Sequence, residues 1–205
     1  MINQNALSPK ILFSCFLASC LEIYDFAIFG FLSVSLHKNY LSFLDVGTAT
    51  LVTYVFFAVG ALFRPIGSLI FGYIGDVYGR KTALVSSVSL MGLASFTMCV
   101  LPSYEMIGLW SCGLIILIRI VHGISVGGEF TGAIIFAVEH SRQNKAAFVA
   151  SIVGAGGACG VLLANIMGKM LQNPSLPSYS WRFAFLIGFS LAIVGYFIRK
   201  QWKRY

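Results

Sequence analysis

The chain has 205 residues, of which 58% are hydrophobic and only 10% are charged. Because roughly a quarter of the residues in a soluble domain are charged, this composition excludes a soluble globular fold and indicates an integral membrane protein. The net charge of +7 does not indicate nucleic-acid binding, since the bases are scattered between apolar runs and do not cluster in one soluble segment.

Six apolar runs are long enough to cross a bilayer, which takes about 20 residues, and they divide the chain into predicted spans. The glycine-rich segment 72–81 is predicted to form a tight turn between the second and third spans. The fourth run has no polar break, so we predict one long helix that ends beyond the membrane surface. The whole chain, 1–205, is expected to be a single all-α bundle with spans at about 11–36, 48–71, 82–101, 107–138, 146–171 and 181–198.

The basic residues predict how the spans are oriented. Nine bases fall on one side of the predicted bundle and three on the other, and an excess of bases marks the cytoplasmic side. We therefore expect a multi-pass protein of the bacterial cell (inner) membrane, in contact with the lipid bilayer and with both termini in the cytoplasm. The nine bases are Lys10, Arg80, Lys81, Arg142, Lys145, Arg199, Lys200, Lys203 and Arg204, and the three are Lys38, Lys169 and Arg182.

Small residues recur every four positions in the fourth and fifth predicted spans, a spacing that lets helix backbones approach closely in lipid. They are Gly123 with Gly127, Gly128 with Gly132, and the series Gly156, Gly160, Ala164 and Gly168. Close helix packing is the simpler interpretation, and sliding of the helices during a functional cycle is the alternative.

Charged side chains within the predicted spans mark the candidate functional site, because each costs about 2.5 to 3.5 kcal/mol at the centre of a span. Glu22 and Asp25 lie three residues apart on one face of the first span. Two carboxylates held close in a low dielectric do not both ionise cheaply, so the pair is a candidate proton carrier. The structural alternative is that each carboxylate pairs with a buried arginine. Arg64, beside Pro65 in the second span, is a further candidate.

The fourth span places Arg119, His122 and Glu129 on one helix face, because they follow one another at three and seven residues. A guanidinium binds a carboxylate through two parallel hydrogen bonds, so Arg119 suits an anionic or zwitterionic substrate, or one of the buried acids. His122 either satisfies a hydrogen bond inside the packed helix or takes part in proton transfer.

The sequence carries no pattern typical of a metal site or an enzyme. The five cysteines lie in apolar runs without a Cys-x-x-Cys pair, and no His-Glu-x-x-His or phosphate-binding loop occurs. We therefore expect no cofactor, no bound metal and no enzymatic activity.

Five motifs carry a resemblance to a known family. They are Glu22 to Phe26, Phe63 to Gly67, the turn with Gly72, Gly75, Asp76, Gly79, Arg80 and Lys81, Gly127 to Ala133, and Ser180 to Phe185. On these motifs the chain resembles the amino-terminal half of a major facilitator superfamily transporter, in the metabolite:proton symporter branch that includes proline/betaine carriers. One position departs from the family, whose Arg-x-x-Gln-Gly motif reads Arg119-Ile120-Val121-His122-Gly123 here.

The resemblance implies six transmembrane helices in two inverted three-helix repeats, which form half of a twelve-helix fold with its binding sites between the halves. It implies a proton-coupled symporter of small zwitterionic or carboxylate metabolites such as proline and betaine, with protons and a small-molecule substrate as partners. For the turn it implies a cytosolic latch, in which Asp76 meets a helix end of the second half, Arg80 lies near Glu139, and Arg142 belongs to the same cluster.

Three interpretations of a six-helix chain stay open. The first is a truncated or split gene product that forms an incomplete symporter half. The second is a half that transports when a separately encoded second six-helix half pairs with it. The third is a membrane interaction or scaffold protein without transport, which includes a homodimer.

Overall fold

A computed structural model describes residues 9–139, 141, 143–173 and 175–200, and this part of the chain is helical apart from its connections. The predicted all-α class is therefore confirmed. The elements are α1 (Pro9–Phe31), α2 (Ser33–Tyr40), α3 (Val46–Leu62), α4 (Arg64–Tyr78), α5 (Arg80–Val100), α6 (Tyr104–Ile107), α7 (Trp110–Glu139), η1 (Gln143–Lys145), α8 (Ala146–Leu171) and α9 (Arg182–Lys200).

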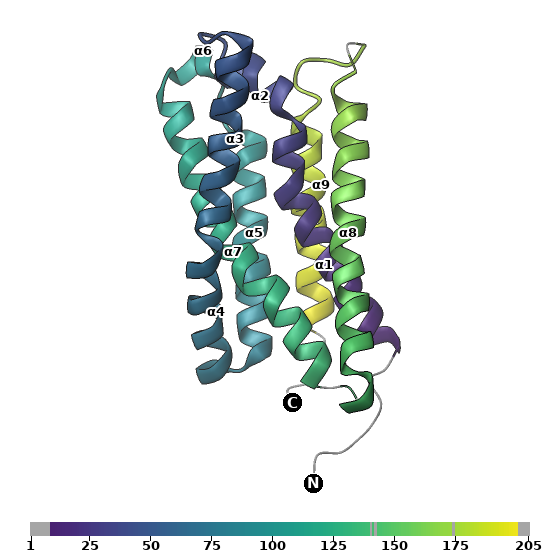
Figure 1. The fold of residues 1–205 in the computed structure, drawn as a ribbon. Helices are drawn as coiled ribbons and strands as arrows, with labels where there is room; N and C mark the ends of the chain where they lie inside the picture. Colours follow the sequence, from purple (N-terminus) through teal and green to yellow (C-terminus); the bar gives the residue numbers. More distant parts are fainter. Residues whose placement is uncertain (1–8, 140, 142, 174, 201–205) are drawn as a thin grey trace.

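The long helices run side by side and alternate in direction, which is the arrangement that successive membrane spans require (Figure 1). The start of α1, the α4–α5 junction, the α7–α8 connection and the end of α9 lie at one end of the bundle, which we call the Gly79 end (Figure 1). The short helices α2 and α6 and the α8–α9 connection lie at the other end (Figure 1).

Five helical stretches of the described chain are long and apolar enough to cross a membrane. The last apolar stretch, Trp181–Phe197, which includes most of α9, is shorter, so the sixth predicted span stays a prediction. The five stretches are Leu12–Phe31, Val46–Tyr78, Arg80–Val100, Trp110–Glu139 and Ala146–Leu171.

The first two predicted spans each contain one interruption. At Leu32 the backbone hydrogen bonds continue from α1 into α2, with the Leu36 N–H donating to the Leu32 carbonyl at 2.9 Å. At Phe63 the chain passes into α4, and Pro65, which has no N–H to donate, lies in the first turn of that helix. Both breaks therefore lie within a continuing helical segment and do not separate two spans.

The turn predicted at 72–81 is wrong in extent. Helix α4 continues through Gly72, Gly75 and Asp76, and α5 already begins at Arg80. Only Gly79, with φ of +93°, leaves the helical conformation, because the left-handed region is open to glycine without a steric penalty. Gly75 is helical, and its lack of a side chain leaves room for Arg80, whose Nη1 atom would lie 3.2 Å from a Cβ at Gly75.

Glycines bring two pairs of helices into backbone contact. A Cβ at Gly160 of α8 would overlap the Cys20 carbonyl of α1, and one at Gly156 would overlap the Phe16 carbonyl. A Cβ at Gly123 of α7 would likewise overlap the backbone of Gly60 in α3. The close approach predicted from the small residues is therefore confirmed for both spans, and it is the arrangement by which helices associate in lipid.

The helix contacts follow the pattern expected of two related three-helix units. Helix α1 packs mainly on α8, α7 packs on the α3–α4 segment, and α5 packs on α9. If α7, α8 and α9 correspond to α1, α3–α4 and α5, exchanging the units converts the first pair into the second and leaves the third unchanged. These three contacts agree with the predicted repeats, whereas α5 also packs extensively on α7 and the corresponding contact of α1 with α9 is smaller.

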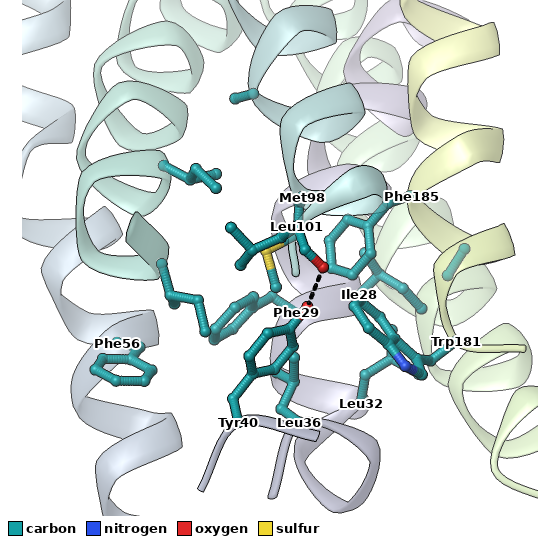
Figure 2. Packing of buried hydrophobic residues seen from close by; sticks show 14 of the residues in the cluster. Ile28, Phe29, Leu32, Leu36, Tyr40, Phe56, Met98, Leu101, Trp181 and Phe185 are labelled. Atoms are coloured by element: carbon teal, nitrogen blue, oxygen red, sulfur yellow. Dashed lines mark hydrogen bonds between the residues drawn. The ribbon is translucent and has the colours of Figure 1, made fainter. Parts of the chain in front are cut away.

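A hydrophobic cluster fills the bundle on the α2 side. Figure 2 shows Phe29, Tyr40, Trp181 and Phe185 converging there, and the Tyr40 hydroxyl donates to the Leu101 carbonyl at 3.1 Å. The Arg182 guanidinium donates to the carbonyls of Cys99 and Leu101, each at 2.9 Å. Because the last carbonyls of a helix lack partners within it, Arg182 caps the end of α5 and joins it to α9.

We predict that Gly160→Ala destabilises the bundle by about 1–3 kcal/mol, because the added methyl group forces α1 and α8 apart. Gly154→Ala is the matched control, since it lies on the same helix and a Cβ there meets nothing within 4 Å. Thermal unfolding in detergent should show a lower Tm for Gly160→Ala alone. Equal Tm values for the two variants would contradict the packing described here.

Candidate functional site

Asp25 of α1 and Arg119 and His122 of α7 meet in the interior of the bundle, with exposed fractions of 0%, 0% and 2%. Arg119 Nη1 lies 3.4 Å from His122 Nδ1, and His122 Nε2 lies 3.1 Å from Asp25 Oδ2. The Ser95 hydroxyl of α5 donates to the same carboxylate oxygen. The three helices therefore meet at one continuous polar chain.

The hydrogen-bond direction in this chain follows from the chemistry of arginine. A guanidinium has only donors, so Arg119 donates and His122 Nδ1 accepts. In a neutral imidazole the other nitrogen then carries the hydrogen, and this nitrogen, Nε2, lies 3.1 Å from Asp25 Oδ2 without forming a hydrogen bond in the described part of the chain. His122 therefore lies between a cation and an anion, in contact with both.

The Asp25 carboxylate is enclosed on its other side by α9. Its Oδ1 atom lies against Gly188, where a Cβ would overlap it, and it has no hydrogen-bond partner among the described residues. A side chain at position 188 would therefore force the Asp25 carboxylate to move. Asp25 thus contacts α5, α7 and α9, and neutralising its carboxylate would change its interactions with all three helices.

Aromatic rings surround the Arg119 guanidinium. Its Cζ atom lies 4.5 Å from the ring centroids of Phe26 and Phe29 and 5.4 Å from that of Phe57. Gly60 leaves the space for it, because a Cβ there would lie 3.0 Å from Nη2. Cation–π contacts offset part of the cost of burying the charge. Within the described chain, Arg119 Nε and Nη2 have no hydrogen-bond partner, so two donors are available to an anion.

The other predicted residues of this site lie around it. Glu22 is fully buried, one turn before Asp25 on α1. The Arg64 guanidinium carbon lies 5.1 Å from the Phe26 ring centroid, so Arg64 and Arg119 share that ring. The side chain of Glu129 lies outside what the structure describes, and the predicted line on α7 is therefore placed only for Arg119 and His122.

The residues of the predicted latch gather at the Gly79 end. Arg80 Nη2 lies 3.1 Å from Asp76 and 3.8 Å from Glu139, so it joins the α4–α5 junction to the end of α7. These pairs are partly exposed, and each contributes about 0–1 kcal/mol. Of the remaining members, Gly72 has open space beside it, Lys81 is half-buried, and Arg142 lies outside the described residues.

Several contributors to the site were not predicted. Ser95 donates a hydrogen bond to Asp25, and Gly188 leaves space for its carboxylate. The three aromatic rings contact the Arg119 guanidinium, and Gly60 leaves space for it. Phe26 is adjacent to Asp25 in sequence, which is the one available signal. The rest are a serine, glycines and phenylalanines in a chain rich in all three, so only their spatial neighbours distinguish them. Within the described residues, no group of three metal-ligating side chains occurs.

Comparison with known proteins shows similarity along nearly the whole chain. The family described as "Sugar (and other) transporter" matches residues 11–202. The glycine betaine/proline/ectoine/pipecolic acid transporter OusA of Dickeya dadantii is 31% identical over 93% of this chain, and the proline/betaine transporter of Escherichia coli is 32% identical over 93%. The chain covers 39% of the length of each of these relatives.

Among solved structures, the xylose transporter XylE of Escherichia coli, in a partially occluded inward-open conformation, matches 95% of this chain with a TM-score of 0.82. The sequence identity is 17%, and the chain covers 48% of that structure. The likeness shows the fold, and the fold corresponds to the amino-terminal half of that architecture.

We predict that the charges of Asp25 and Arg119 are energetically coupled. Asp25→Asn and Arg119→Gln should each destabilise the bundle by about 3–5 kcal/mol, because each leaves one buried charge without its counter-charge. The double variant should lose clearly less than the sum of the two, as measured by unfolding in increasing dodecyl sulfate. Additive losses would show that the two charges do not depend on each other.

Proposed function

The chain belongs to the sugar (and other) transporter family of the major facilitator superfamily, and from this membership we propose that it forms the amino-terminal six-helix half of a proton-coupled symporter. The observation that carries the proposal is the buried polar chain from Arg119 through His122 to Asp25. Ionisable side chains inside membrane helices are costly and mark ion and substrate pathways. The family is one of transporters and not of enzymes.

A small zwitterion or carboxylate is the substrate class that suits this site. The relatives are named for proline and betaines, each of which carries one carboxylate and one cationic nitrogen. The unpartnered donors of Arg119 at Nε and Nη2 form the fork that binds a carboxylate with two parallel hydrogen bonds. The adjacent Phe57 ring, which is half-buried, offers a π face to a cationic nitrogen.

Asp25 is the proposed proton carrier, with Glu22 one turn away as a second acid. Asp25 contacts α5, α7 and α9, so neutralising its charge changes the interactions of each of these helices. Alternating access in this superfamily rocks one six-helix half against the other around a midplane site. A proton taken up on one side of the membrane is thereby released on the other.

The second half of the carrier is the proposed partner of the latch residues. Arg80 bridges Asp76 and Glu139. The Asp76 side chain nevertheless remains 70% exposed at the Gly79 end, where a helix end of the second half can contact it. The excess of bases that the sequence assigns to this side of the membrane supports its placement in the cytoplasm of a bacterial cell, with the protein in the inner membrane. That the chain is a truncated or split gene product, or that the second half is separately encoded, stays a prediction.

We predict that Asp25→Asn and Arg119→Lys each abolish pH-driven proline uptake by a complete carrier, made by joining the chain to the remainder of the Escherichia coli proline/betaine transporter. Asparagine removes the proton site, and lysine lacks the carboxylate-binding fork. The assay follows labelled proline in cells with an imposed pH gradient. Normal uptake by both variants would refute the assignment of these residues.

Asp45→Asn is the control for this assay. Asp45 is exposed and caps α3, where its carboxylate accepts a hydrogen bond from the Thr48 N–H at 2.9 Å, which lowers the pKa of the carboxyl. Asparagine caps helices equally well, so uptake should be unchanged.

We also predict that the chain alone, purified into proteoliposomes, shows no saturable uptake, because a site between two halves has only one wall here. Measurable uptake that Asp25→Asn removes would overturn the half-transporter proposal. If the chain is instead a scaffold protein without transport activity, the joined carrier that contains the unmodified chain should show no proline uptake.

A further inference from the structure

Ser95 of α5 donates a hydrogen bond to the buried Asp25 carboxylate. Its hydroxyl donates to Oδ2, and both side chains are fully buried. The contacts of Asp25 with α7 and α9 are of another kind. His122 Nε2 lies 3.1 Å from Oδ2 without forming a hydrogen bond, and Oδ1 lies against Gly188. Within the described residues, Ser95 therefore supplies the one side-chain hydrogen bond that stabilises the ionised carboxylate.

Ser95 differs in this respect from the other hydroxyls of its helix. A serine or threonine inside a helix can donate to the backbone carbonyl three or four residues earlier. In the described chain, the other α5 hydroxyls that form a hydrogen bond all do so, and they are those of Thr82, Ser87, Ser89 and Thr97. Ser95 has the same choice in the Met91 carbonyl, but it donates to α1 instead. The charge of Asp25 explains this choice, because a hydrogen bond to an ionised acceptor is the stronger one.

A hydroxyl can serve a carboxyl group in both of its protonation states, because it donates one hydrogen bond and also accepts. While Asp25 is ionised, the Ser95 hydroxyl donates to Oδ2. When Oδ2 takes up a proton from water, the new Asp25 O–H donates to Ser95 Oγ, and the hydroxyl hydrogen of Ser95 turns to the Met91 carbonyl. The charge of Asp25 changes from −1 to 0, and the two oxygens stay hydrogen-bonded with the direction reversed.

We propose that Ser95 is a positioning residue for the proton on Asp25, which donates to the carboxylate and accepts from the acid. The proposal rests on the proposed function, in which Asp25 carries the proton, and adds α5 to it. The ionised form gains the stronger, charge-assisted hydrogen bond, so Ser95 favours release of the proton. Burial has the opposite effect on an acid, since it disfavours the charged form. Ser95 thereby makes a buried acid able to release its proton as well as to bind it.

The charged groups around Asp25 are the same in every variant described below, so they do not account for a difference between variants. Helix α3 has no charged residue, and Lys169 of α8 is exposed in the last turn. The Tyr24 hydroxyl is directed to the Ala184 carbonyl of α9, at 3.3 Å. The charged and titratable groups nearest to Asp25 are Glu22 on α1, His122 and Arg119 on α7, and Arg64, which shares the Phe26 ring with Arg119.

Three variants separate the role of the Ser95 hydroxyl from a structural role of a buried serine. Ser95→Ala removes the hydrogen bond to Asp25, and Ser95→Thr keeps a hydroxyl at the same position. Ser87→Ala is the matched control, because Ser87 is also fully buried on α5 but donates to the Leu84 carbonyl at 3.1 Å. If Ser95→Ala does not fold, Ser95→Cys replaces it, since a thiol is a weak donor.

The test on the chain itself is a pH titration by nuclear magnetic resonance, with the full chain in lipid nanodiscs and ¹³C in the aspartate carboxyl groups. The chain has three aspartates, and Asp25→Asn identifies the signal of Asp25. Loss of the hydrogen bond to the ionised form should raise the midpoint of the Asp25 titration by about one to two pH units in Ser95→Ala. The midpoint should stay unchanged in Ser87→Ala and Ser95→Thr, and Ser95→Cys should give a smaller rise.

An unchanged midpoint in Ser95→Ala, or in Ser95→Cys where that variant replaces it, would overturn the role of Ser95, and so would an equal rise in Ser87→Ala. In both cases the proton site at Asp25 would stand. An Asp25 signal that does not move with pH in the unmodified chain would instead refute the proton site of the proposed function, and the role of Ser95 with it.

The joined carrier supplies a functional readout. The external pH at which proline uptake is half-maximal should rise in Ser95→Ala, in the same direction as the titration midpoint, and should be normal in Ser87→Ala and Ser95→Thr. A normal pH profile in Ser95→Ala would overturn the proposal. If the unmodified joined carrier shows no uptake, the failure falls on the proposed function, and the resonance titration still decides the role of Ser95.

Discussion

Two opposite charges inside the bundle, on Asp25 and Arg119, are the constraint on which the rest of the site depends. Each would cost several kcal/mol if buried alone. His122 lies between them in contact with both, the Ser95 hydroxyl donates a hydrogen bond to the carboxylate, and aromatic faces surround the guanidinium. Asp25 lies on α1 and contacts α5, α7 and α9. A change in the charge of its carboxylate would therefore alter the contacts of all four helices. This property supports the proposal that the site couples proton binding to helix movement.

Glycine packing is what makes such a charge cluster possible. The helices that carry the charges approach until their backbones touch, at Gly160 against α1 and at Gly123 against α3. The same lack of side chains at Gly60 and Gly188 leaves the volume that the guanidinium and the carboxylate occupy. The smallest residues of the chain therefore serve two purposes: they hold helices together in lipid, where hydrophobic attraction between helices is absent, and they define the shape of the polar site.

Much of this organisation follows from the sequence, and the exceptions have physical causes. Charges are rare in the apolar runs, so the sequence alone singles out Asp25, Arg119 and His122, and long apolar runs predict helices directly. The segment 72–81 differs from its prediction because glycine lowers helix propensity, whereas a backbone in lipid must satisfy its hydrogen bonds within the helix, so α4 continues to Tyr78 and only Gly79 takes a positive φ. Ser95 and Gly188 could not be predicted, since their importance comes from α5 and α9 lying against Asp25, and one sequence contains no information about that proximity.

The central claim is that the chain from Arg119 through His122 to Asp25 couples proton movement to the movement of a zwitterion. The most direct measurement is the internal pH of proteoliposomes that contain the complete joined carrier and an enclosed pH-sensitive dye, with proline added outside and no pH gradient imposed. The account predicts that proline entry acidifies the interior. Proline entry without a change in internal pH would contradict it.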